Sequence, residues 1–413
     1  MKSSLVGCAA LAIAVVFGSS FWSGAVEANS PQSFDAVQNP DKFAWDLFIE
    51  LNHPALAGQR GVADSKRKLG DSGETVWETW ANAGTEVFQN DGCKPPAWGQ
   101  WQKKLRESFT SNKEPASKID IALQRAVQRK DQKAGQFNLL FDPQEPVSET
   151  RMNRAAFEFI RDNGLYSLEG QENFHKQGRA IELPKEAREI KSAWRLLSDS
   201  EVKSGRFHTA SSPDGNTYGL IALHIITKDL PQWFWSTFEH VDNSDLDIRD
   251  TSGDVRWLDR HTDGGDFSKL PAEVKGTKWQ NYRLKGTQTQ YVTLDGRPTV
   301  LANAIIERGF MGSSSCISCH AHATIGDRVP GTTGDNRLPI FEDIRFDYLD
   351  TTAPKTPNSK RARFIKGWMG APDPDLFYSR DYVAKRSSVR AYTQTDFMWS
   401  FFRAVSETNC KGG

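Results

Sequence analysis

The residues with the clearest capacity for chemistry lie at positions 316 to 320. They read Cys316-Ile317-Ser318-Cys319-His320, a C-x-x-C-H pattern. In this pattern each thiol can add to one vinyl group of a haem while the adjoining imidazole binds the iron. Two intervening residues place the sulfurs about one helical turn apart, which matches the two vinyl edges. The spacing therefore predicts one covalent haem c, attached through Cys316 and Cys319, with His320 as the iron ligand.

Other uses of a C-x-x-C pair explain these residues less well. A structural disulfide or a thioredoxin-like redox pair leaves the following histidine without a role. Half of a zinc site would need a second closely spaced pair of cysteines. Outside the N-terminal segment discussed below, the other cysteines are Cys93 and Cys410, which are far apart in the chain. Chance occurrence of a five-residue pattern is the other alternative.

The first residues resemble a secretory signal peptide. Lys2 precedes a run of apolar and small residues at 5–17 that is too short to cross a bilayer as a mature helix. The sequence before Asn29 predicts cleavage after Ala28, with a second option a few residues earlier. Cys8 resembles a lipoprotein cysteine, but most of the apolar core lies after it rather than before it. We therefore expect a periplasmic protein.

Export has consequences for the mature chain. No later segment approaches roughly 18 uncharged apolar residues, so we expect no transmembrane segment in the mature protein. An oxidising compartment also favours pairing of the two thiols outside the haem motif. The sequence therefore predicts a Cys93 to Cys410 disulfide.

Composition sets the broad class and the kinds of partner. The chain has 413 residues, of which 38% are hydrophobic and 25% charged, enough for a large folded core. Its 52 basic and 52 acidic residues cancel, so no global field favours nucleic acid or anionic lipid. The expected partners are a periplasmic redox partner or a small-molecule ligand, and no nucleic acid.

Periodicity predicts an α+β fold. After the signal peptide (1–28) we expect a mainly helical N-terminal region (29–180), an antiparallel β-rich haem c region (181–330) and a loop-rich C-terminal wrapping region with a final helix (331–413). The expected helices are 41–51, 76–87, 119–127, 154–160, 300–308, a short one from Cys316, and 396–405. The expected strands are 190–197, 217–227 and 232–241.

Several stretches together carry a resemblance. Residues 181–184 and 189–194, the strand at 218–227, the aromatic strand at 232–243 and the motif at 314–320 resemble a bacterial family of large monohaem cytochromes c over most of the mature chain. The order of these elements is also similar to that of the cytochrome P460 and cytochrome c′-β group. That second resemblance implies a haem on an antiparallel β domain, with a distal site accessible to small ligands. Some members of that group crosslink a strand lysine to the haem, and Lys191 has a similar position in the pattern.

The sixth iron ligand stays open. Met369, in a glycine-flanked loop after the motif, could close the site as in helical cytochromes c, whereas Met398 lies on an apolar segment that suits core packing. In the β-type site the aromatic strand at 233–238 would cover the haem. The polar residues expected to approach it are then Lys191, His224, Glu239 and His240. His322 is too near His320 to reach the opposite haem face, so we expect it at the surface or near a propionate.

Two functional classes follow. An electron-transfer protein needs a haem with two protein ligands and a docking face. An enzyme acting on a small oxidant or nitrogen species needs an open distal position beside proton-transfer groups. The sequence leaves open whether the chain is an enzyme and which residues would be catalytic.

Overall fold

The structure is a computed structural model, and it describes residues 35–89, 91–100, 146–213, 215–243, 248–249, 255–257, 269–307, 314–327, 370–372, 374–378, 390–407 and 410. The segment predicted as a signal peptide lies outside these residues, as does the helix predicted at 119–127. Helices and turns of helix are α1 (Asp35–Gln38), α2 (Pro40–Leu51), η1 (Trp77–Thr79), η2 (Ala83–Val87), η3 (Trp98–Gln100), α4 (Arg154–Asp162), α5 (Leu168–Lys176), α6 (Asp199–Ser204), η6 (Lys278–Asn281), α7 (Cys316–His320), η9 (Pro374–Tyr378) and η10 (Trp399–Arg403). Strands are β1 (Ala81–Asn82), β2 (Val147–Met152), β3 (Arg188–Leu196), β4 (Thr209–Ser211), β5 (Thr217–Thr227), β6 (Phe234–His240), β7 (Ile248–Arg249), β8 (Val255–Trp257), β9 (Tyr282–Gln288), β10 (Thr324–Ile325) and β11 (Thr393–Gln394).

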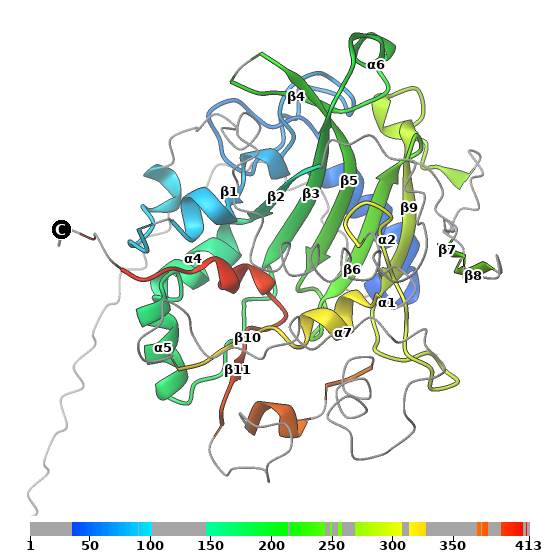
Figure 1. Ribbon diagram of the computed structural model, residues 1–413. Coiled ribbons are helices and arrows are strands. Elements are labelled where there is room, and N and C mark those ends of the chain that lie inside the picture. Colours follow the sequence, from blue (N-terminus) through cyan, green and yellow to red (C-terminus); the bar gives the residue numbers. More distant parts are fainter. Residues whose placement is uncertain are drawn as a thin grey trace, which may run out of the picture. The chain divides into compact units, whose positions relative to one another are not determined.

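An antiparallel sheet organises these elements (Figure 1). Its strand order is β1-β2-β3-β5-β6-β9, with β4 pairing on β5. The predicted strands at 190–197, 217–227 and 232–241 are confirmed as β3, β5 and β6, and the α+β class is confirmed with them. β1 and β2 come from earlier in the chain and extend the sheet beyond β3.

One face of the sheet packs against helix α2, and we call it the α2 face. The helix begins with Pro40, whose fixed φ suits the first helical position, and its buried side chains recur at helical spacing. Phe43 meets Phe234 at 4.8 Å between ring centroids, and Phe48 meets Phe238 at 4.4 Å. This aromatic layer is the centre of the core.

The opposite face carries helix α7, and we call it the motif face. Residues 301–307 and the C-terminal segment 391–405 also lie there (Figure 1). Segment 391–405, which includes η10, is joined to the chain after α7 by the short β10–β11 pair. Residues far apart in the sequence therefore meet on this face.

Three predicted helices differ from the structure. Residues 301–307 form irregular structure and turns, because their backbone donors bond side chains: the Ala304 amide donates to Glu239, which lies on the sheet. The final helix is only the 3₁₀ turn η10, since Asp396 and Phe397 have positive φ, outside α-helical geometry. Residues 76–87 are not one helix, because β1 interrupts them to pair with β2.

The predicted helices at 41–51 and 154–160 are confirmed as α2 and α4, and the helix from Cys316 is confirmed as α7. Cys93 and Cys410 form the predicted disulfide, with their Cα atoms 5.4 Å apart. Within the described ranges, no helix combines the length and the apolar character needed to cross a bilayer.

Candidate haem site

Helix α7 is held in place by its own N-cap and by two other segments. At its start, the Ser315 hydroxyl accepts a hydrogen bond from the Ser318 amide, an N-cap. The Gln288 side chain on β9 accepts from the Ile317 amide at 2.9 Å, and the Gly370 amide donates to the Ser318 hydroxyl at 3.0 Å. A five-residue helix is not stable alone, so these contacts fix its position on the motif face.

The two sides of α7 differ in exposure. Ile317 and Ser318 are fully buried against the protein, whereas Cys316, Cys319 and His320 keep partial exposure. Positions i, i+3 and i+4 share one side of a helix, so the three predicted haem residues are presented together. Cys316 and Cys319 are free thiols.

His320 has the contacts expected of a metal-binding histidine. Its Nδ1 lies 2.7 Å from the carbonyl oxygen of Phe397. A carbonyl oxygen only accepts, so Nδ1 carries the hydrogen and Nε2 offers its lone pair. Burial lowers the pKa of His320 to about 3, which keeps the ring neutral. With two free thiols beside it, this donor set fits a c-type haem.

Aromatic groups enclose the motif. The Trp235 ring on β6 lies 4.5 Å from the His320 ring, and the Trp399 ring lies 6.4 Å from it. Burial raises the pKa of Cys319 to about 12, with Trp399 acting in the opposite direction, and burial also raises the pKa of Cys316. Both sulfurs are therefore neutral thiols at neutral pH.

A row of polar residues crosses the motif face. Lys191, His224 and Thr237 are direct neighbours on β3, β5 and β6, so their side chains leave the sheet on the same side. Nε2 of His224 lies 3.4 Å from the Glu307 carboxylate, which also accepts a hydrogen bond from the Asn303 amide at 2.7 Å. The structure thus brings Lys191 and His224 to the side of the sheet that bears α7.

Charge links this row to the motif. Burial acts to raise the pKa of Glu307, but His224 and Lys191 lower it overall, so the carboxylate stays ionised. The positive charge of Lys191 also acts to lower the pKa of His320 and of Cys319. Glu307 is a site residue that the sequence did not reveal, because its pattern predicts a helix at 300–308, whereas the observed segment is irregular and brings the Glu307 carboxylate to His224.

Two of the four predicted distal residues have other roles. Glu239 shares the face of His224, but it accepts from the Ala304 amide and lies 3.9 Å from the Lys285 ammonium. The prediction for His240 is wrong. Because side chains alternate along β6, His240 lies on the α2 face with Phe238.

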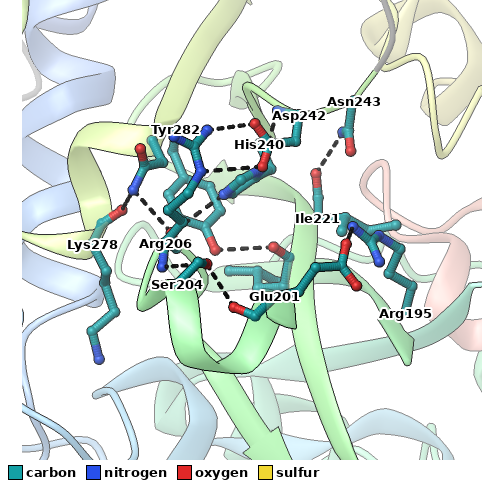
Figure 2. Close-up of polar contacts among 12 residues, drawn as sticks. Arg195, Glu201, Ser204, Arg206, Ile221, His240, Asp242, Asn243, Lys278 and Tyr282 are labelled. Carbon is teal, nitrogen blue, oxygen red and sulfur yellow. Dashed lines mark hydrogen bonds and ion pairs between the residues drawn. The ribbon is translucent and has the colours of Figure 1, made fainter. Parts of the chain in front are cut away.

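His240 belongs to a separate cluster, shown in Figure 2. Its ring stacks on Phe207 with centroids 3.8 Å apart, and its Nδ1 accepts a hydrogen bond from the Asp242 amide. Asp242 pairs in turn with Arg206. Burial lowers the pKa of His240 to about 4, so it is a neutral, packed histidine.

The expected aromatic cover is smaller than the sequence indicated. Of the aromatic residues on β6, Trp235 faces the motif, whereas Phe234 and Phe238 pack against α2. Met398 is buried in the core, as expected. Met369 lies outside the described residues. His322 is buried, not at the surface, with Nδ1 2.6 Å from the Ser318 carbonyl oxygen.

The chain was compared with known proteins. No protein-family model, no curated protein and no solved structure matches it.

Proposed function

We propose that this chain is a periplasmic monohaem c-type cytochrome that functions in electron transfer. Cys316 and Cys319 would attach the haem, and His320 would be the proximal iron ligand. The observation that carries the proposal is the shared, partly exposed side of α7 with the His320 Nδ1 hydrogen directed to Phe397. The haem would supply one-electron chemistry. The chain would orient the imidazole and exclude water with Trp235 and Trp399.

The proposed periplasmic location has its own support. The Cys93–Cys410 disulfide is of the kind that persists in oxidising compartments. The N-terminal sequence has the charged, apolar and small-residue order of an export signal. Cleavage after Ala28 would leave Cys93, Cys316, Cys319 and Cys410 in the mature chain.

Mass spectrometry tests the proposal directly. The mature protein, purified from cells with active cytochrome c maturation, should have the mass of the polypeptide plus one haem after denaturation. Cys316→Ser and Cys319→Ser should each weaken covalent retention, and the double variant should abolish it. Cys93→Ser with Cys410→Ser is the matched control and should retain the full haem mass. A wild-type chain without added haem would refute the proposal.

A haem enzyme acting on a small oxidant or nitrogen species is the second candidate. The group of Lys191, His224 and Glu307 favours it, because an ionised carboxylate beside an imidazole can accept and pass a proton. Lys191 would hold positive charge near an anionic ligand. The resemblance to cytochrome P460 also makes Lys191 the residue to examine for a haem crosslink.

Optical spectra of the reduced protein separate the two candidates. A shift on addition of carbon monoxide would indicate an open iron position and favour the enzyme. An unchanged spectrum would indicate two protein ligands and favour electron transfer. Glu307→Gln, which keeps the size of the side chain but removes its charge, should alter the pH dependence of ligand binding only in the first case.

A further inference from the structure

The carbonyl group that meets His320 belongs to an unusual stretch of backbone. Phe397 follows His320 by 77 residues, and it has φ of 70°, while Asp396 before it has φ of 49°. Non-glycine residues rarely adopt this left-handed region, although aspartate tolerates it better than most. Such residues are energetically unfavourable and persist only where surrounding contacts fix them.

The contacts that fix this turn converge on one side chain. The buried Asp396 carboxylate accepts a hydrogen bond from the Leu183 amide at 2.8 Å and from the Trp233 indole at 3.3 Å. Lys228 forms an ion pair with the same carboxylate. A buried carboxylate without partners would be strongly unfavourable, so these three donors explain why the charge is tolerated here.

The donors come from the β-rich region rather than from α7. Leu183 precedes β3, Lys228 follows β5, and Trp233 precedes β6. The Asp396 side chain therefore ties segment 391–405 to the sheet independently of the helix that carries His320. Because Asp396 and Phe397 are consecutive, fixing the first restricts the direction of the second residue's carbonyl group.

We propose that Asp396 is a positioning residue for the proximal ligand, and this rests on the proposed haem function. It holds the Phe397 carbonyl oxygen against Nδ1 of His320 and so sets the strength of that hydrogen bond. Partners of this kind fix the tautomer and orientation of a metal-binding histidine and raise its basicity. A stronger hydrogen bond lets the imidazole donate more electron density, which favours the oxidised state.

The test compares two substitutions in the haem-loaded, full-length mature protein. Asp396→Asn and Asp396→Ala remove the same charge, but only asparagine keeps an acceptor oxygen and the tolerance for left-handed φ. The measurement is the midpoint reduction potential from a spectroelectrochemical titration. We expect the midpoint potential of Asp396→Ala to be higher than that of Asp396→Asn. The expected difference is a tenfold change in the ratio of oxidised to reduced protein at a given potential, which corresponds to about 59 mV for one electron.

A control in the same segment separates positioning from general loosening. Thr393 makes a buried 2.9 Å contact with Nδ1 of His175, and Thr393→Val removes it without touching Asp396. This variant should melt at a lower temperature with an unchanged potential. Equal potentials for the two Asp396 variants, or an equal shift in Thr393→Val, would overturn the proposal.

Two further measurements keep the outcome decisive. If Asp396→Ala does not fold, Trp233→Phe removes one donor to Asp396 while keeping an aromatic ring, and it should raise the potential by a smaller amount. No shift in that variant would count against Asp396. The haem mass of each protein is recorded first. Loss of haem from the wild type refutes the proposed function, whereas retained haem with no shift refutes only the role of Asp396.

Discussion

The two faces of the central sheet use the same strands for opposite purposes. On the α2 face, β6 contributes Phe234 and Phe238 to an aromatic layer. On the motif face, the alternating residues of the same strand are Trp235, Thr237 and Glu239, and each contacts a group outside the sheet. One strand therefore supplies apolar packing on one side and specific polar contacts on the other.

This difference shows how polar side chains with specific contacts can be placed on a stable framework. The polar row of Lys191, His224 and Thr237 would weaken a core if it had to supply the packing energy, because buried polar groups stabilise little even when paired. The α2 face supplies that energy instead. The motif face can then keep partly exposed groups beside buried ones.

The largest expected change in the free energy of unfolding comes from a substitution on the α2 face. Phe238→Ala removes a fully buried ring and should lower the free energy of unfolding by about 4 kcal/mol, with the haem mass unchanged. Thr237 is the neighbour of Phe238 on the same strand and lies on the motif face. Thr237→Val removes only a 2.8 Å hydrogen bond from Asn303 and should lower the free energy of unfolding by about 1 kcal/mol. Denaturant titration of both variants checks this. Equal losses would show that the two faces do not differ as described.

The disulfide is expected to stabilise the folded chain without affecting the contacts on either face of the sheet. Replacing Cys93 and Cys410 together by serine should lower the free energy of unfolding by about 3 kcal/mol. The loop it closes is long, but the tail is also held by contacts such as Ser167 to Glu407. The absorption spectrum should not change. A changed spectrum would mean that the tail determines the geometry of the motif face.

The stability of the protein is expected to depend on pH through Glu189, a buried carboxyl group on the motif face. Burial raises the pKa of Glu189 to about 7 from 4.5. The folded protein therefore holds this proton more tightly, and the stabilisation is fully present below pH 4.5 and lost as pH rises to about 7. Glu189→Gln should remove this loss of about 2–3 kcal/mol over the window, measured by denaturation at several pH values.

Glu201 provides the control for that experiment. Its hydrogen bond with Arg195 lowers the pKa of Glu201 to about 2. Its contribution is present above pH 4.5 and is lost only as pH falls toward 2, below the window in question. Glu201→Gln should therefore leave the slope between pH 4.5 and 7 unchanged. If both variants changed the slope of unfolding free energy against pH in a similar way, Glu189 would not be the cause of that slope.

The smallest expected effect concerns the sixth iron ligand of the proposed haem. If the motif face keeps an axial position free of methionine, Met369→Leu should leave the absorption spectrum and reduction potential nearly unchanged. Met398→Leu is the matched core substitution. Loss of a far-red methionine-to-iron band together with a lowered potential in Met369→Leu alone would identify Met369 as the ligand and favour electron transfer.

The sequence predicted elements with strong periodicity and clear ends. α2, α4, β3, β5 and β6 follow their apolar patterns, and α7 follows from the motif. Residues 301–307 and 396–405 contain apolar runs that suggested helices, but tertiary contacts decide their backbone. The Asn303 side chain bonds Thr237, and the Asp396 side chain bonds groups from three segments.

The site itself was predictable only in part. Lys191 and His224 could be placed on strands, and their pairing follows once β3 and β5 are antiparallel neighbours. His240 was wrongly placed although a signal existed. Glu239 and His240 are consecutive on β6, so both cannot face the motif. Glu307, Asp396 and Phe397 have no local signal, because only the path of the chain brings them to His320 and His224.

The separation of 77 residues between His320 and Phe397 also bears on the biogenesis of the protein. Attachment of a haem requires both thiols to be reached, yet in the folded chain Leu301 and Trp399 contact them. Covalent attachment would therefore precede docking of segment 391–405. A segment that follows the motif along the chain would then close a site that had already received the proposed haem, and a variant truncated before Thr393 would acquire haem but lack the acceptor for His320.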